Sequence, residues 1–158
     1  MKKLICLAAW TMIWLPQNVQ AQLSIAYYPF QSELSFSTHT ERLLWGDLRL
    51  LTNTFWGNIT TEPALMANVL QGQRANTYLG LGSNFNFFNA ASGLPILNGY
   101  VLYLGVRFKP IQALPQIQLI GELSPYMNPQ FDGGLLRTRL GVAYQFERRR
   151  DGDSPISE

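Results

Sequence analysis

The chain of 158 residues is poor in the residues from which most active centres are built, since it has one cysteine and one histidine and only 14% of its residues are charged. It contains no phosphate-binding glycine-rich loop, no cluster with metal-ligand spacing and no catalytic triad spacing. After residue 21, no run reaches the roughly 18 apolar residues of a membrane-spanning helix. We therefore expect no cofactor, no metal and no helical membrane span.

The first 21 residues have the three-part pattern of a secretory signal peptide. Lys2 and Lys3 precede an apolar run of 12 residues from Leu4 to Leu15, and Ala21 ends a small-residue cleavage site. The run is well short of the roughly 20 residues that a spanning helix needs. We predict cleavage after Ala21, which would also remove Cys6 and with it any disulfide, thiolate nucleophile or cysteine-bound metal.

The net charge of the mature chain argues against nucleic acids as partners. Removal of two lysines with the signal peptide lowers the basic residues from 12 to 10, which equals the 10 acidic residues. A formally neutral chain lacks the electrostatic attraction on which nucleic-acid binding depends, so we expect no nucleic-acid partner. The length indicates one domain, residues 22–146, followed by a short tail, residues 147–158, which we expect in the periplasm.

The end of the chain alternates strictly in side-chain character. In residues 135–146, one face carries Leu136, Thr138, Leu140, Val142, Tyr144 and Phe146. The other face carries Arg137, Arg139, Gly141, Ala143 and Gln145. A period of two indicates a strand with one face in an apolar medium and the opposite face wet or charge-paired.

Similar alternation along the chain predicts an all-β fold, an eight-stranded antiparallel up-and-down transmembrane barrel. The predicted strands are residues 23–29, 33–39, 43–55, 60–71, 75–87, 99–109, 116–126 and 135–146. Most of them have about the ten residues that a tilted strand needs to cross a bilayer. The first two could instead form one bent strand, and Pro63 must lie near a strand end or at a bulge. A soluble β-sandwich would show the same period and remains the alternative fold.

Aromatic residues near the strand ends predict two girdles at the membrane surfaces. The outer girdle would comprise Tyr28, Phe55, Trp56, Phe85, Phe87, Tyr100 and Tyr126, and the inner one Trp45, Phe108, Tyr144 and Phe146. The alternative is that these rings fill a soluble core.

The closing pattern Arg139-x-Gly141-x-x-Tyr144-x-Phe146 resembles the C-terminal signal by which the barrel assembly machinery recognises its clients. With it, the whole mature chain resembles the small eight-stranded outer-membrane β-barrel proteins of Gram-negative bacteria, of OmpA-type and OmpX-type architecture. The resemblance implies a location in the outer membrane, contact with outer-membrane lipid, and the assembly machinery as a partner during biogenesis. The tail is too short to be the peptidoglycan-binding domain of OmpA-type proteins.

The predicted lumen is charged. The inward charges are Asp47, Arg49, Arg107, Lys109, Glu122, Arg137 and Arg139. Because a barrel of eight strands is just wide enough for side chains to fill it, we expect these groups to pair and to leave no open pore. Glycines on the same face (Gly80, Gly82, Gly105 and Gly141) would make room for the arginines. The alternative is a selectivity ring in a narrow ion or solute pore.

The hypothesis that the protein is an enzyme depends on its only histidine, His39. Some eight-stranded barrels resemble lipid A acyltransferases and deacylases that use His and Ser, and Ser35 and Ser37 share a face with His39. However, side chains two residues apart on a strand lie about 7 Å from each other, too far for a Ser–His hydrogen bond. We therefore expect no catalysis, and keep a lipid A-modifying enzyme as the alternative.

One predicted surface loop, residues 88–98, contains the apolar residues Leu94, Ile96 and Leu97. Apolar residues in an outer loop suggest contact with another protein or with lipid, unless the loop folds over the barrel mouth. The sequence thus predicts an integral outer-membrane barrel with a structural or interaction role, and names no ligand or partner.

Overall fold

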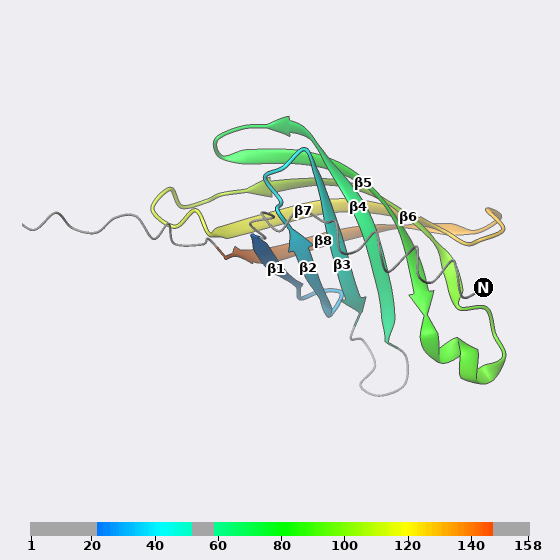
Figure 1. Ribbon diagram of the computed structural model, residues 1–158. Helices are drawn as coiled ribbons and strands as arrows, with labels where there is room; N and C mark the ends of the chain where they lie inside the picture. The colour runs from blue at the N-terminus through cyan, green and yellow to red at the C-terminus, as the bar shows by residue number, and fades with distance from the viewer. Residues whose placement is uncertain (1–21, 52–58, 147–158) are drawn as a thin grey trace, which may run out of the picture.

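The computed structural model describes residues 22–51 and 59–146 (Figure 1). The predicted signal peptide (residues 1–21), the predicted tail (residues 147–158) and the last part of the predicted strand 43–55 lie outside the described residues.

Eight antiparallel strands form one closed barrel in sequence order, and β1 pairs with β8 to complete it. The strands are β1 (Leu23–Tyr28), β2 (Glu33–Thr38), β3 (Leu44–Leu51), β4 (Thr60–Gln71), β5 (Ala75–Asn86), β6 (Leu97–Phe108), β7 (Ile117–Met127) and β8 (Gly134–Gln145). The predicted up-and-down barrel of eight strands is therefore confirmed. The first two strands are separate and form a hairpin in which Tyr28 faces Glu33.

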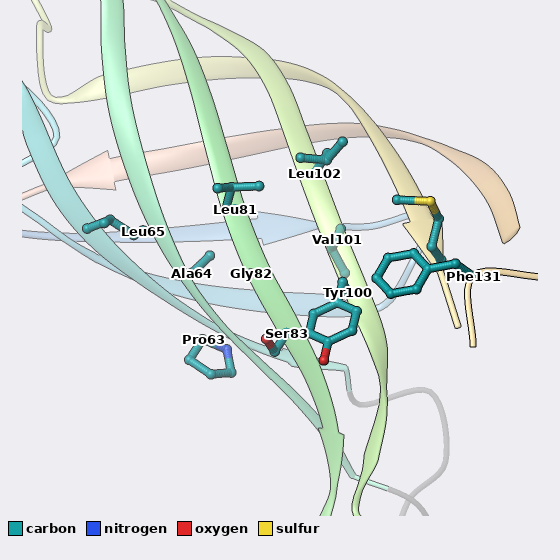
Figure 2. Close-up of a pocket in the computed structure, with 11 residues that line it drawn as sticks. Pro63, Ala64, Leu65, Leu81, Gly82, Ser83, Tyr100, Val101, Leu102 and Phe131 are labelled. Carbon is teal, nitrogen blue, oxygen red and sulfur yellow. The ribbon is translucent and has the colours of Figure 1, made fainter. Parts of the chain in front are cut away.

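Strand alternation determines which side chains face outward. In β6 every second residue is buried in the lumen, and the residues between them, such as Leu102, Leu104 and Val106, are exposed. Figure 2 shows the outward leucines Leu65, Leu81 and Leu102 on the neighbouring strands β4, β5 and β6. The exposed face of the barrel is apolar.

The two aromatic girdles are partly wrong. Tyr28 and Trp45 are buried in the lumen, and Tyr126 shares the lumen-facing alternation of β7 and donates to Asn98 O. Phe85, Phe87, Tyr100, Phe108, Tyr144 and Phe146 follow the outward face, whereas Phe55 and Trp56 lie outside the described residues. The reason is the pleat, because a residue near a strand end still points inward when its position in the alternation requires it.

The barrel has two unlike ends. At one end, which we call the terminal end, the described chain begins and finishes; at the other, the loop end, lie the connections 29–32, 87–96 and 128–133. β1 and β2 have six residues each, whereas β5, β6 and β8 have 12. The wall is consequently longer over β4 to β8 than over β1 and β2 (Figure 1).

Pro63 lies within β4, opposite Leu48 of β3, and not at the bulge of this strand, which falls between Asn68 and Leu70. Pairing of β4 with β5 holds at Thr61 and resumes at Ala64. Proline has no N–H to donate, and its position coincides with this gap in the ladder.

The connection between β5 and β6 is shorter than predicted. It begins with a 3₁₀-helix, η1 (Phe87–Ser92), and Leu97 is already the first residue of β6, paired with Phe85. The expectation that Leu97 belongs to a surface loop is therefore wrong, whereas Leu94 and Ile96 are exposed in the connection. Within residues 22–51 and 59–146, no helix is long and apolar enough to cross a membrane.

Candidate functional site

The charged residues of the strands face the lumen. The eight strands contain eight charged residues, and every one shares the lumen-facing alternation of its strand. They are Glu33, Asp47, Arg49, Glu62, Arg107, Glu122, Arg137 and Arg139. Four arginines and four carboxylates balance, so the lumen is formally neutral.

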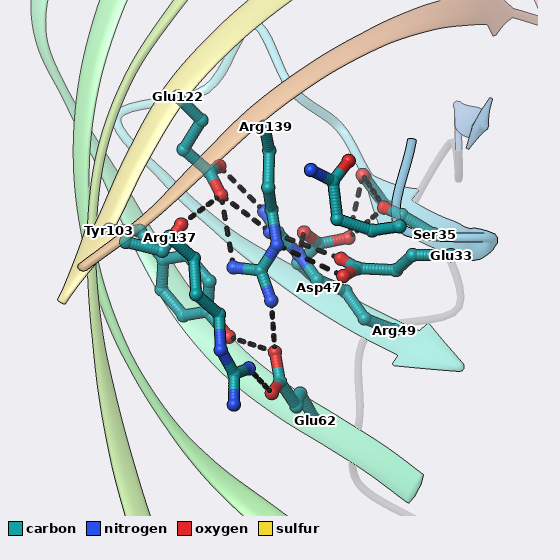
Figure 3. Close-up of polar contacts among 12 residues, drawn as sticks. Glu33, Ser35, Asp47, Arg49, Glu62, Tyr103, Glu122, Arg137 and Arg139 are labelled. Atoms are coloured by element: carbon teal, nitrogen blue, oxygen red, sulfur yellow. Dashed lines mark hydrogen bonds and ion pairs between the residues drawn. The ribbon is translucent and has the colours of Figure 1, made fainter. Parts of the chain in front are cut away.

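Arg49 of β3 spans the lumen to β7 (Figure 3). Its Nη1 and Nη2 donate to the two carboxylate oxygens of Glu122 at 2.7 and 2.8 Å, and its Nε donates to Asp47 at 2.7 Å. Its guanidinium also lies 4.3 Å from the ring centroid of Tyr103. The forked contact joins strands that are not neighbours, and so fixes the width of the barrel.

Arg139 of β8 contacts three carboxylates. Its guanidinium lies 3.0 Å from Glu33, 2.9 Å from Glu62 and 3.4 Å from Glu122. Arg137, two residues earlier, bonds Glu62 at 2.8 Å and lies over the Tyr126 ring. Arg137 is the partly exposed member of the cluster, with 23% of its side chain accessible. Together, the two arginines tie β8 to β2, β4 and β7.

Neutral donors complete the coordination of the carboxylates. Tyr78 donates to Glu122 at 2.7 Å, Tyr103 donates to Glu62 at 3.0 Å, and Ser35 donates to Asp47 at 2.6 Å. Ser124, Ser37 and Asn84 make further bonds of the same kind. Buried charges are tolerated when they are paired and hydrogen-bonded. Every charge of this cluster is paired, and its only buried atoms without a hydrogen bond are Glu33 Oε2 and Arg139 Nε, which lie 3.0 Å apart.

Two of the predicted lumen charges lie outside this cluster. Arg107 is buried but pairs with no carboxylate among residues 22–51 and 59–146. Its Nη2 donates to Ser37 at 3.1 Å and its guanidinium lies 4.7 Å from the Trp45 ring centroid. Lys109 lies beyond the end of β6, where it pairs with Glu41 at 2.7 Å on the surface. Lys109 is half-buried and does not join the buried ion-pair cluster, although its backbone N–H still donates to Arg74 O across the sheet.

The inward-facing glycines make room for aromatic rings and a thioether, and not for the arginines. A Cβ on Gly105 would meet the Tyr78 ring, and a Cβ on Gly82 would lie 3.0 Å from the Tyr103 ring. On Gly141 it would lie 2.7 Å from Cδ1 of Tyr28, and on Gly80 it would meet the sulfur of Met66. The glycines therefore accommodate rings and a thioether from adjacent strands, and those rings in turn flank the arginines.

Sequence reasoning missed two central carboxylates. Glu33 shares a face with Ser35 and Ser37, and Glu62 shares one with Asn68, so alternation alone could have placed both inward. The alternation was hard to recognise because β2 has only six residues and because a proline follows Glu62.

The structure does not bring His39 together with the serines. Its Nδ1 lies 3.2 Å from Oε1 of Gln22, whereas Ser35 and Ser37 both donate to Asp47. His39 lies in the turn after β2, with φ of 30°. Among the described residues there is also no group of three His, Cys, Asp or Glu side chains that could hold a metal.

The four residues that resemble an assembly signal lie on both faces of the barrel wall. Arg139 and Gly141 point inward, where they contact the carboxylates and the Tyr28 ring. Tyr144 and Phe146 point outward, edge to face with ring centroids 4.9 Å apart.

No protein-family model, curated protein or solved structure matches this chain.

Proposed function

We propose that this protein is an integral outer-membrane β-barrel of the small eight-stranded type, with a structural or interaction role and no catalysis. The observation that carries the proposal is the placement of charge: in the strands that the structure describes, all eight charged residues face the lumen and none faces outward. A barrel in water would need the opposite arrangement, because a continuous apolar exterior promotes aggregation. In a bilayer, a closed barrel with an apolar exterior satisfies its backbone and buries its charge.

The packed lumen supports a structural role over a pore. The side chains of Arg49 and Arg139 are fully buried and bonded to carboxylates of strands across the barrel. An ion would have to break these pairs in order to pass. The exposed apolar residues Leu94 and Ile96 after η1 are candidates for contact with a protein partner.

Electrophoresis of the outer-membrane fraction, boiled against unboiled, tests the proposal directly. A membrane-embedded barrel resists detergent until it is heated, so we expect faster migration of the unboiled sample and recovery of the protein in the membrane fraction. Recovery as a soluble protein that migrates alike in both samples would contradict membrane insertion.

The proposed assembly signal can be separated from folding. Replacing Phe146 with alanine is expected to reduce the folded protein in the outer membrane several-fold, because the assembly machinery would lose a recognition element. The same variant should refold from urea into detergent micelles as the wild type does, since Phe146 lies outside the strand and is exposed.

The matched control is Phe108→Ala, which removes another exposed ring at the terminal end. It should leave both measurements unchanged. Equal losses of assembly for the two variants would argue that any outward ring matters and that Phe146 carries no signal.

A further inference from the structure

Three asparagine side chains join the buried ion pairs of the lumen to the connection between β5 and β6. Asn84 of β5 donates to Oε1 of Glu62 at 2.6 Å. Asn98 of β6 donates to Oδ1 of Asn84 at 2.9 Å, and Asn89 of η1 donates to Oδ1 of Asn98 at 3.1 Å. Glu62 and Asn84 are buried, and Asn98 and Asn89 are half-buried. These bonds, which we call the asparagine chain, lead from the lumen to the loop end.

The amides of the asparagine chain all point the same way, each with its NH2 group toward Glu62. An ionised carboxylate can only accept hydrogen bonds, so the amide beside it must donate. The oxygen of that amide is then left to accept from the next one, and hydrogen bonds aligned in this way polarise and strengthen one another. The charge of Glu62 therefore orients each asparagine in turn.

A β-bulge brings Asn98 into the asparagine chain. Asn84 pairs with Gly99, but the next residue of β5, Phe85, pairs with Leu97. Asn98 is thus the extra residue of a bulge, a position at which a side chain can be re-aimed. Strict alternation along β6 would turn Asn98 outward, because Gly99 beside it faces the lumen. The bulge instead directs its side chain to Asn84.

The outer end of the asparagine chain holds the connection at residues 87–96. The side chain of Asn89 also donates to Pro95 O at 2.9 Å, and its backbone oxygen accepts from Leu94 N at 2.9 Å. Both bonds lie directly beside the exposed apolar side chains of Leu94 and Ile96. The chain therefore fixes the segment that presents these two side chains at the surface.

We propose that Glu62 is a positioning residue for this surface: its charge orients the asparagine chain, which holds Leu94 and Ile96 in one arrangement. The inference deepens the interaction role proposed above and rests on it. A segment that is already ordered loses less conformational entropy when a partner binds, which favours affinity. A change at a carboxylate buried in the lumen would thus be transmitted to the loop end of the barrel.

Hydrogen exchange of the barrel refolded in detergent micelles, followed by mass spectrometry of the peptide covering residues 86–98, tests the proposal. Asn84→Leu cuts the link to Glu62 but leaves the ion pairs and the outer bond of the chain in place. We expect it to raise the exchange rate of this peptide roughly tenfold, because the connection opens more often.

Glu62→Gln keeps an oxygen at this position but removes the charge that orders the amides. Since a bond to a charged acceptor is about twice as strong as a neutral one, we expect exchange of residues 86–98 to rise roughly threefold. The double variant should exchange no faster in this peptide than Asn84→Leu alone, because the charge acts on the connection only through the asparagine chain.

The matched control is Asn68→Leu, which replaces another buried asparagine. Asn68 donates to Thr40 O at 2.8 Å and to Arg42 O at 2.6 Å, at the terminal end of the barrel. Its replacement should raise exchange at residues 39–43 and leave residues 86–98 as in the wild type.

Several results would overturn the proposal: wild-type exchange of residues 86–98 in both Asn84→Leu and Glu62→Gln, additive effects in the double variant, or an equal rise in this peptide for Asn68→Leu. Asn84→Leu guards against a Glu62→Gln variant that does not fold. Fractionation of the wild-type protein tests its membrane location separately, so failure of the proposed function and failure of this inference are distinguishable.

Discussion

Replacing Glu122 with glutamine is expected to destabilise the folded barrel by about 3–5 kcal/mol, the usual cost of breaking a buried ion pair. Glu122 accepts both forked bonds of Arg49 and a bond from Tyr78. The amide keeps the volume but removes the charge, which leaves the buried Arg49 guanidinium short of a counter-ion. The free energy of unfolding, from urea titration in vesicles with the gel shift as readout, measures the loss.

The matched control is Glu41→Gln, which removes the partner of Lys109 at the surface. The Glu41 side chain is 47% exposed, and pairs of this kind contribute about 0–1 kcal/mol. If both variants lost equal stability, the lumen cluster would be no more important than a surface pair, and a packed, structural lumen would be contradicted.

A valine at Gly141 should be the second most damaging change, at about 1–3 kcal/mol, because it overpacks the place where the barrel closes. The first carbon of the new side chain would lie 2.7 Å from Cδ1 of Tyr28 and 3.0 Å from the backbone oxygen of Tyr27. Both neighbours belong to β1, and Tyr27 pairs with Val142, the residue after Gly141. Refolding into detergent micelles, followed by the gel shift, measures the fraction of closed barrel.

Gly121→Val provides the control, since a Cβ at this outward glycine finds only Leu140 at 3.8 Å. It should refold as the wild type does. Exchanging Tyr28 for leucine should recover part of the stability lost in Gly141→Val. If refolding is normal but assembly in cells fails, Gly141 would act in recognition by the assembly machinery and not in packing.

Alternation made most of the fold predictable, since it depends on local sequence alone. The bounds of β4 agree with the predicted strand 60–71, and the inward positions of Asp47, Arg49 and Glu122 follow from the same rule. Alternation also places Trp45, two residues before Asp47, on the inward face. The prediction of the girdles was wrong there because it considered only how far a residue lies from the strand end. The choice of partners was harder to predict, since Lys109 pairs with Glu41, which lies outside the strands.

The sequence by itself determined the number of strands and the face of each side chain within them. It thereby determined an apolar exterior around a charged interior. The reason is that alternation has a period of two and is a property of each strand alone, whichever strand it pairs with. Only the tertiary structure decided which charges meet. Arg49 and Glu122 are 73 positions apart, and their contact depends on the closure of the barrel. The same holds for the rings over Gly105 and Gly141, because their contacts arise from the register between strands, which local sequence does not encode.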